Sequence, residues 1–190
     1  MLPCICVLVV LVVPLAWGIA MYNSLVRSRQ HVKEAWSQID VELKRRYELI
    51  PNLVETVKGY AKHEQETLDL AIRARNQAYT NTQSSPANQA RDENDMVHAI
   101  GRLLAVAEAY PDLKADRQFL ELQRELSHTE NRIQRVRRFY NGNVRDLNTK
   151  VQVFPTNIFA GMFGFTQAEY FEIDEAVRQP VKVDVDTRGR

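Results

Sequence analysis

The stretch FLELQRELSHTENRIQRVRRFYNGNVRDLNTKV, residues 119–151, decides the fold class of this 190-residue chain. Its apolar side chains, with one threonine among them, recur every three or four residues without a break, which is the spacing of one α-helix face. The residues are Phe119, Leu122, Leu126, Thr129, Ile133, Val136, Tyr140, Val144, Leu147 and Val151. A helix with one apolar face has to bury it against other helices, so the stretch predicts an all-α protein.

A second apolar seam runs through the first half of the chain. From residue 25 to residue 79 apolar side chains again fall mostly three or four apart, in a heptad-like, coiled-coil pattern. The pattern predicts one long rod that continues from the N-terminal segment without a loop. Pro51 lies inside it, and since the periodicity resumes at once, we expect a kink there rather than an end.

A third helix is expected between these two patterns. Residues 80–95 are polar and rich in small side chains, as in a loop. Within them, Ser85 and Pro86 are typical of an N-cap and a first helical position. The helix would run to about residue 110, where Pro111 ends it, and Asp116 is the expected cap of the helix over residues 119–151.

The N-terminal segment has no charged side chain from residue 1 to residue 26. A helix of this length can cross about 30 Å of hydrocarbon, so we expect a transmembrane anchor over residues 1–24, followed by a helical bundle over residues 25–178. Arg27, Arg29 and Lys33 follow the apolar run, which predicts an N-terminus outside and a bundle in the cytoplasm. A cleaved signal peptide is the alternative, although no basic residue precedes the apolar run.

A second uncharged segment is FPTNIFAGMFGF, residues 154–165, where proline and glycines break the helical pattern. Either it caps the distal end of the bundle, or it contacts a bilayer or a neighbouring subunit. The contact residues would be Phe154, Ile158, Phe159, Met162, Phe163 and Phe165. A short fourth helix is expected over residues 166–178, and residues 179–190 form a C-terminal tail.

Helix lengths predict how far each part reaches. At about 1.5 Å per residue the rod is roughly 80 Å long, and the next helix returns about two fifths of that distance. The helix over residues 119–151 would then run outward again and place residues 154–165 at the pole farthest from the membrane. The first half of the rod would have no partner in its own chain. We therefore expect it to bind a second copy through Val32, Trp36, Ile39 and Leu43.

No catalytic or metal-binding pattern stands out. The two cysteines, Cys4 and Cys6, lie in the apolar N-terminus, which excludes a thiolate site in the bundle. Glu125 and His128 form an E-x-x-H pair on a helix, but they fall off the apolar seam, where a di-metal bundle site would need them. They are expected to be solvated surface residues. His63, beside Glu64 and Glu66, is expected to form an ion pair on a helix surface. We expect no catalytic residue, no cofactor and no metal.

Basic residues occur in the runs KRR, residues 44–46, and RIQRVRR, residues 132–138. Acidic neighbours dilute their field and the formal net charge is only +1, which argues against a nucleic-acid partner. They are expected to form the charged face of the bundle, or ion pairs between subunits with Glu42, Glu48 and Glu55.

The chain resembles the LemA family of bacterial membrane proteins in several long stretches. These are YNSLV (22–26), EAWSQIDVELKRRYELIPNLVETVKGYAKHE (34–64), LLAVAEAYPDLKADRQFLELQRELSHTENRI (103–133), FYNGNVRDLNTKVQVFPTNIFAGMFGF (139–165) and EYFE (169–172). The resemblance implies one N-terminal membrane helix and a cytoplasmic antiparallel helical bundle at the inner membrane. It carries over no catalytic residues. Similar proteins include one required for making magnetosome membranes and others genetically tied to membrane proteases.

These observations favour a non-enzymatic, membrane-anchored protein that assembles with itself into a scaffold, organising or remodelling the membrane. The expected partners are the lipid bilayer and further copies of the chain, with another membrane protein as a further possibility. Two alternatives stay open. The chain could be an adaptor or regulator of a membrane protein such as a protease, or a bundle metalloprotein.

Overall fold

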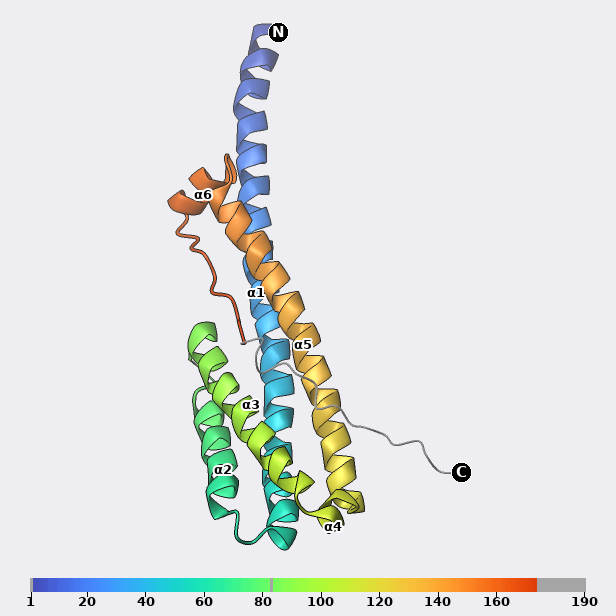
Figure 1. Ribbon diagram of the computed structural model, residues 1–190. Coiled ribbons are helices and arrows are strands. Elements are labelled where there is room, and N and C mark those ends of the chain that lie inside the picture. Colours follow the sequence, from blue (N-terminus) through green and yellow to red (C-terminus); the bar gives the residue numbers. More distant parts are fainter. Residues whose placement is uncertain (1, 83, 174–190) are drawn as a thin grey trace, which may run out of the picture.

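The computed structural model describes residues 2–82 and 84–173, with side chains from residue 12 onward. Over these residues the protein is all-α, as predicted, and contains no strand. Its elements are α1 (Leu2–Tyr60), α2 (Gln65–Thr80), α3 (Pro86–Glu108), α4 (Pro111–Lys114), α5 (Arg117–Gln152) and α6 (Thr156–Met162). Figure 1 shows α1 as the axis, with α5 running antiparallel to it and the α2–α3 hairpin packed beside its C-terminal half.

The predicted rod over residues 25–79 is wrong at one place, because α1 ends at Tyr60 and the chain reverses over residues 61–64. Ala61 is fully buried at the turn, where its amide donates to Val57 O at 2.8 Å. No apolar residue follows until Leu68, which is buried in α2. A helix continuing straight on would have left Leu68 without cover, whereas the reversal packs α2 against α1. Pro51 lies inside the continuous α1, and its kink stays a prediction.

This additional reversal inverts the direction of everything after it. Because α2 turns back, α3 runs toward the α1–α2 turn and α5 starts there (Figure 1). The end of α5 and the whole of α6 therefore lie beside the N-terminal half of α1, not at the opposite pole. The predicted location of residues 154–165 at the end farthest from the N-terminal segment is wrong for this reason.

The reversal also covers the seam that was expected to bind a second copy. Ile39 and Leu43 are buried in the main core, which they share with Tyr140, and Val32 is only 9% exposed. The ring of Trp36 lies 5.3 Å from that of Tyr140 and 5.4 Å from that of Phe171, measured between centroids. The four residues predicted for self-association thus pack inside their own chain, because α5 lies along α1 where no partner was expected.

The predicted caps are confirmed. Ser85 Oγ accepts a hydrogen bond from the Asn88 amide, with Pro86 at the start of α3. Asp116 Oδ1 accepts from the Phe119 amide at 2.8 Å at the start of α5, and this bond holds the pKa of the Asp116 carboxyl below its usual range. The Tyr60 hydroxyl donates to Asp116 Oδ2 at 3.0 Å, which ties the end of α1 to the start of α5.

The predicted fourth helix is wrong over residues 166–173, which form no helix and run back from α6 along α5 (Figure 1). Two asparagines of α5 hold this strap. Asn148 Nδ2 donates to Ala168 O at 2.9 Å, and its Oδ1 accepts from the Ala168 amide at 2.8 Å. Asn141 binds both backbone groups of Phe171 in the same way. These side chains satisfy the backbone groups that a helix would satisfy internally. Residues 174–178 and the predicted tail lie outside the described residues.

Candidate functional site

One end of the molecule carries most of the large apolar side chains that face outward. They come from two segments far apart in the sequence, the N-terminal part of α1 and the chain around α6, which lie side by side in Figure 1. The α1 members are Val12, Val13, Leu15, Trp17, Ile19 and Tyr22, and the others are Val153, Phe154, Ile158, Met162 and Phe163. We call these eleven residues the apolar end. Contiguous exposed apolar surface of this kind marks a contact site.

Aromatic contacts hold α6 against α1. The Phe159 ring meets Trp17 edge-on at 5.7 Å between centroids, and Tyr22 meets Phe163 at 4.8 Å. Gly18 permits this approach, because a Cβ at that position would lie 3.1 Å from Phe159 Cε1. Leu25, Ala160 and Phe165 form a small core beneath these rings.

The six predicted contact residues divide into two groups. Phe165 is buried and Phe159 is half-buried, and both pack on α1. Phe154, 74% exposed, faces outward with the other three, Ile158, Met162 and Phe163. The segment therefore does cap an end of the bundle, although not the end expected. Its outward residues remain available for contact, and contact with a bilayer or a subunit stays a prediction.

A charge boundary separates the apolar end from the rest of the bundle. No charged residue occurs in residues 1–26 or in residues 151–168. The first charges beyond them are Arg27 and Arg29 on α1, Lys150 on α5, and Glu169 in the strap that follows α6. Ser28 Oγ accepts from Lys150 Nζ at 2.7 Å and donates to Asp146 Oδ2 at 3.3 Å, so the two boundaries lie at the same level of the bundle.

On both α1 and α5, the first charged side chain on the bundle side of this boundary is therefore a cation. The guanidinium of Arg29 lies 4.7 Å from the centroid of the Phe165 ring, a cation–π contact between the two sides of the boundary. Lys150 pairs with Asp146 at 3.2 Å one turn further into the bundle. The sequence pattern contained both uncharged segments, but only the fold shows that they meet.

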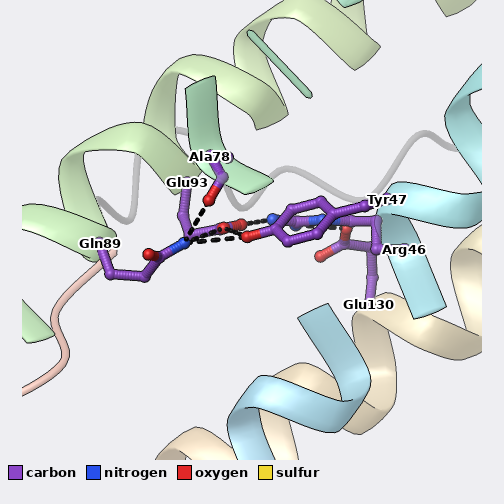
Figure 2. Close-up of polar contacts among 6 residues, drawn as sticks. All are labelled: Arg46, Tyr47, Ala78, Gln89, Glu93 and Glu130. Carbon is purple, nitrogen blue, oxygen red and sulfur yellow. Dashed lines mark hydrogen bonds and ion pairs between the residues drawn. The ribbon is translucent and has the colours of Figure 1, made fainter. Parts of the chain in front are cut away.

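A buried polar network lies in the other half of the bundle (Figure 2). Arg46 is 0% exposed and pairs with Glu93, which is equally buried, and its Nη1 donates to Glu130 Oε1 at 2.7 Å. The Tyr47 hydroxyl donates to Glu93. Gln89 Nε2 donates to both the Tyr47 hydroxyl and Glu93 Oε1, at 2.9 Å each.

This network joins α1, α3 and α5 through side chains alone, and Gln89 Nε2 also donates to Ala78 O of α2 at 3.4 Å. Burial raises the pKa of the Tyr47 hydroxyl, which stays protonated and keeps its role as a donor. With its charges paired inside the core, the network positions the α2–α3 hairpin on α1 and α5.

Sequence reasoning missed this network. It placed the run over residues 44–46 on the charged face, and the exposed Lys44 and Arg45 do lie there, but Arg46 points inward. The signal available in the sequence was the spacing of the apolar seam. Leu43 and Ile50 are two helical turns apart, so one further position between them must also face the core. Arg46 and Tyr47 occupy that position, and both are fully buried.

The remaining polar candidates lie on the surface, as predicted. Glu125 and His128 are exposed on α5. His63 is exposed too, but it lies in the turn over residues 61–64 and not on a helix as predicted. Within the described ranges, no group of three or more His, Cys, Asp or Glu residues is placed to hold a metal ion. Arg132 approaches Glu42 at 3.9 Å across α5 and α1, so an ion pair that was a candidate for a subunit interface forms within one chain.

Among the residues that the structure describes, none of the helices has the length and apolar character needed to cross a membrane. The anchor predicted over residues 1–24 falls in large part on residues 1–11, whose side chains lie outside the described part. It therefore stays a prediction.

Comparison with known proteins adds a family and several relatives. A model of the LemA family matches residues 35–185. Protein LemA of Metamycoplasma hominis is 29% identical over 165 residues, which are 87% of this chain and 73% of that protein. Magnetosome protein MamQ 2 of Paramagnetospirillum magneticum is 24% identical over 184 residues, 84% of this chain and 68% of that protein. Magnetosome protein MamQ of Magnetospirillum gryphiswaldense is 22% identical with the same coverage. None of these three names denotes an enzyme.

Proposed function

The chain belongs to the LemA family, and we propose that it is a non-enzymatic membrane protein whose apolar end enters the bilayer while the bundle stands in the cytoplasm. One observation carries the proposal. Two uncharged segments, separated by more than a hundred residues in the sequence, meet at one end and stop at a common level, marked by the contact of Ser28 with Lys150. A bilayer surface gives a physical reason for such a shared boundary, because it excludes charges on one side and favours them on the other.

The energy of leaving the apolar end in water supports the same conclusion. Fully burying one Phe, Ile, Leu or Met side chain contributes about 1.5–3 kcal/mol. The five outward residues of the α6 region are each at least half exposed, and moving four of them, Phe154, Ile158, Met162 and Phe163, into lipid would contribute roughly 4–6 kcal/mol. The exposed α1 residues add to this value. That is enough to hold the end of the bundle at a membrane.

The N-terminal segment is the anchor in this proposal. A helix over residues 2–26 is about 36 Å long, enough for the hydrocarbon core. The cations that follow it, Arg27, Arg29 and Lys33, favour a bundle on the cytoplasmic side and an N-terminus outside the bacterial inner membrane.

Self-assembly into a scaffold that organises or remodels the membrane is the finer part of the proposal. The names of two relatives, which place them at the magnetosome, are consistent with such a role. The seam around Ile39 is buried within its own chain, so it no longer supports self-assembly. Contacts between copies would instead use the apolar end, where Trp17, Ile19 and Phe163 still face outward.

Charged residues placed on the outer face of α1 test the attachment. We expect Val13→Glu combined with Ile19→Glu to release the protein from bacterial membranes during alkaline carbonate extraction, because an acidic side chain costs about 2.5–3.5 kcal/mol at the centre of a membrane helix. Both residues are exposed, so the bundle should still fold. The matched control is Val41→Glu, an exposed valine on the same helix but inside the charged region, which should leave the protein in the membrane fraction. Equal extraction of the two variants would count against the proposal.

A further inference from the structure

The α6 region, residues 153–165, lies on the membrane side of the charge boundary but beside only a limited length of α1. We propose that it is a wedge that enters only the lipid leaflet on the side of the bundle. The inference deepens the proposed function and rests on it for the anchoring of α1. Beyond the anchoring of α1, it assigns a second element to the membrane and states how deep that element reaches and which leaflet it occupies.

The contacts of α6 set the depth. The α1 residues that hold it are Trp17, Gly18, Tyr22 and Leu25. Trp17 precedes Ser28, at the charge boundary, by eleven residues, which is about 16 Å along a helix axis. Half of the hydrocarbon core is about 15 Å thick, so α6 would reach the middle of the bilayer. Figure 1 shows α1 continuing alone beyond α6.

The backbone of the wedge is suited to lipid, where unpaired polar groups are costly. The amides of Asn157, Phe163 and Phe165 donate to carbonyl oxygens of the same segment at 2.9, 3.0 and 2.9 Å, and the Val153 amide donates to Thr149 O of α5 at 2.9 Å. The Thr156 hydroxyl donates to Val153 O at 2.8 Å. Pro155 has no amide to satisfy. A short, glycine-containing segment thus satisfies much of its own hydrogen bonding, and its large outward side chains are apolar, with Asn157 as an exposed polar residue among them.

The base of the wedge carries the cations. Arg29 stacks over Phe165, and Lys150 binds Ser28 beside it. In the proposed position these groups lie at the level of the lipid phosphates, where basic residues are favoured. The inserted side chains above them, Phe154, Ile158 and Met162, take up area in one leaflet only. Insertion of this kind is sensitive to membrane curvature, which links the wedge to a membrane-shaping role.

Fluorescence quenching by lipids tests the wedge in the full-length chain. With Cys4→Ser and Cys6→Ser removing the native thiols, Ile158→Cys would carry an environment-sensitive fluorophore. The protein is inserted into vesicles of phosphatidylethanolamine and phosphatidylglycerol that hold spin-labelled lipid in one leaflet at a time. The label at position 158 should lose most of its fluorescence when the quencher is on the bundle side, and little when it is on the far side. A label from Val41→Cys, exposed on the bundle, should be unaffected.

Other outcomes would overturn the inference, and they separate it from the proposed function. If position 158 behaves like position 41 while a label from Val13→Cys is quenched, α1 is in the membrane and the wedge is wrong. Quenching of position 158 from the far leaflet alone, or equally from both, also excludes insertion in one leaflet. If positions 13 and 158 both stay unquenched, the proposed membrane attachment fails together with the wedge.

Discussion

Replacing Arg46 with methionine is expected to lower the free energy of unfolding by about 3–5 kcal/mol, which is the usual cost of removing one partner of a buried ion pair. The guanidinium is fully buried and pairs with Glu93, whose carboxylate is also fully buried. Without the arginine, this carboxylate keeps hydrogen bonds from Tyr47 and Gln89 but has no cation. For a chain of this size the midpoint of thermal unfolding should fall by about 10 °C, measured by circular dichroism in mild detergent.

Two further variants make this prediction specific. Arg45→Met changes the adjacent arginine, whose side chain is 44% exposed and only weakly paired with Glu42 at 3.7 Å, so it should alter stability by less than about 0.5 kcal/mol. Adding Glu93→Gln to Arg46→Met removes the unpaired charge and should recover part of the loss. A double variant that is less stable than the single one would contradict the role given to the ion pair.

Replacing Ile39 with glutamate is expected to unfold the region where α1 packs on α5. Ile39 is 0% exposed and belongs to the main core. Removing a buried isoleucine side chain costs about 2–5 kcal/mol, and a buried carboxylate without a partner adds several more. Helical content and the midpoint of unfolding should both fall. The matched control is Val41→Glu, two residues along the same helix and 62% exposed, which should be close to neutral.

The Ile39→Glu variant also separates the two accounts of this seam. If Ile39 faced a second copy, the substitution would give a folded protein of smaller assembled size. Because α5 covers the seam, we expect loss of structure rather than loss of assembly. Size-exclusion chromatography with light scattering, run beside circular dichroism, distinguishes these outcomes. A fully folded variant with reduced assembly would restore the original prediction.

Features that depend on local sequence could be predicted. The helix over residues 119–151 follows from its unbroken three-and-four spacing, and the caps at Ser85 and Asp116 follow from side chains able to accept backbone hydrogen bonds. The uncharged segment over residues 154–165 was also visible as a contact candidate, because absence of charge is a local property. Its helical part, α6, was hidden by Pro155 and two glycines, although proline and glycine are tolerated near helix ends.

Features that depend on chain direction could not be predicted. The turn over residues 61–64 has no proline, and Gly59 alone is a weak signal within a charged stretch. Because this one reversal was not predicted, the expected direction of α5 was inverted and α6 was expected at the wrong end of the bundle. For the same reason the seam around Ile39 was expected to lie uncovered. The common level of Ser28 and Lys150, on which the proposed function depends, is a consequence of that reversal.

Pairings between side chains were also beyond the sequence. Arg46 lies in a basic run that resembles an exposed face, and its partner Glu93 lies 47 residues later with no pattern linking them. The strap over residues 166–173 is a similar case. Asn141 and Asn148 are seven residues apart on α5, but only the fold shows that they bind the backbone of a later segment.

Accessibility of spin labels, measured residue by residue in reconstituted membranes, tests most directly whether the two uncharged segments enter the bilayer together. Single cysteines along residues 20–30 of α1 and residues 145–158 at the end of α5 and in α6, in a Cys4→Ser, Cys6→Ser background, would carry the labels. The account predicts that labels on the bundle side are accessible to a water-soluble nickel reagent and that labels on the apolar side are accessible to lipid-soluble oxygen. The change should occur at the level of Ser28 on α1 and of Lys150 on α5. Labels at positions 154 and 158 that stay accessible to nickel, while those at positions 20–24 do not, would contradict it.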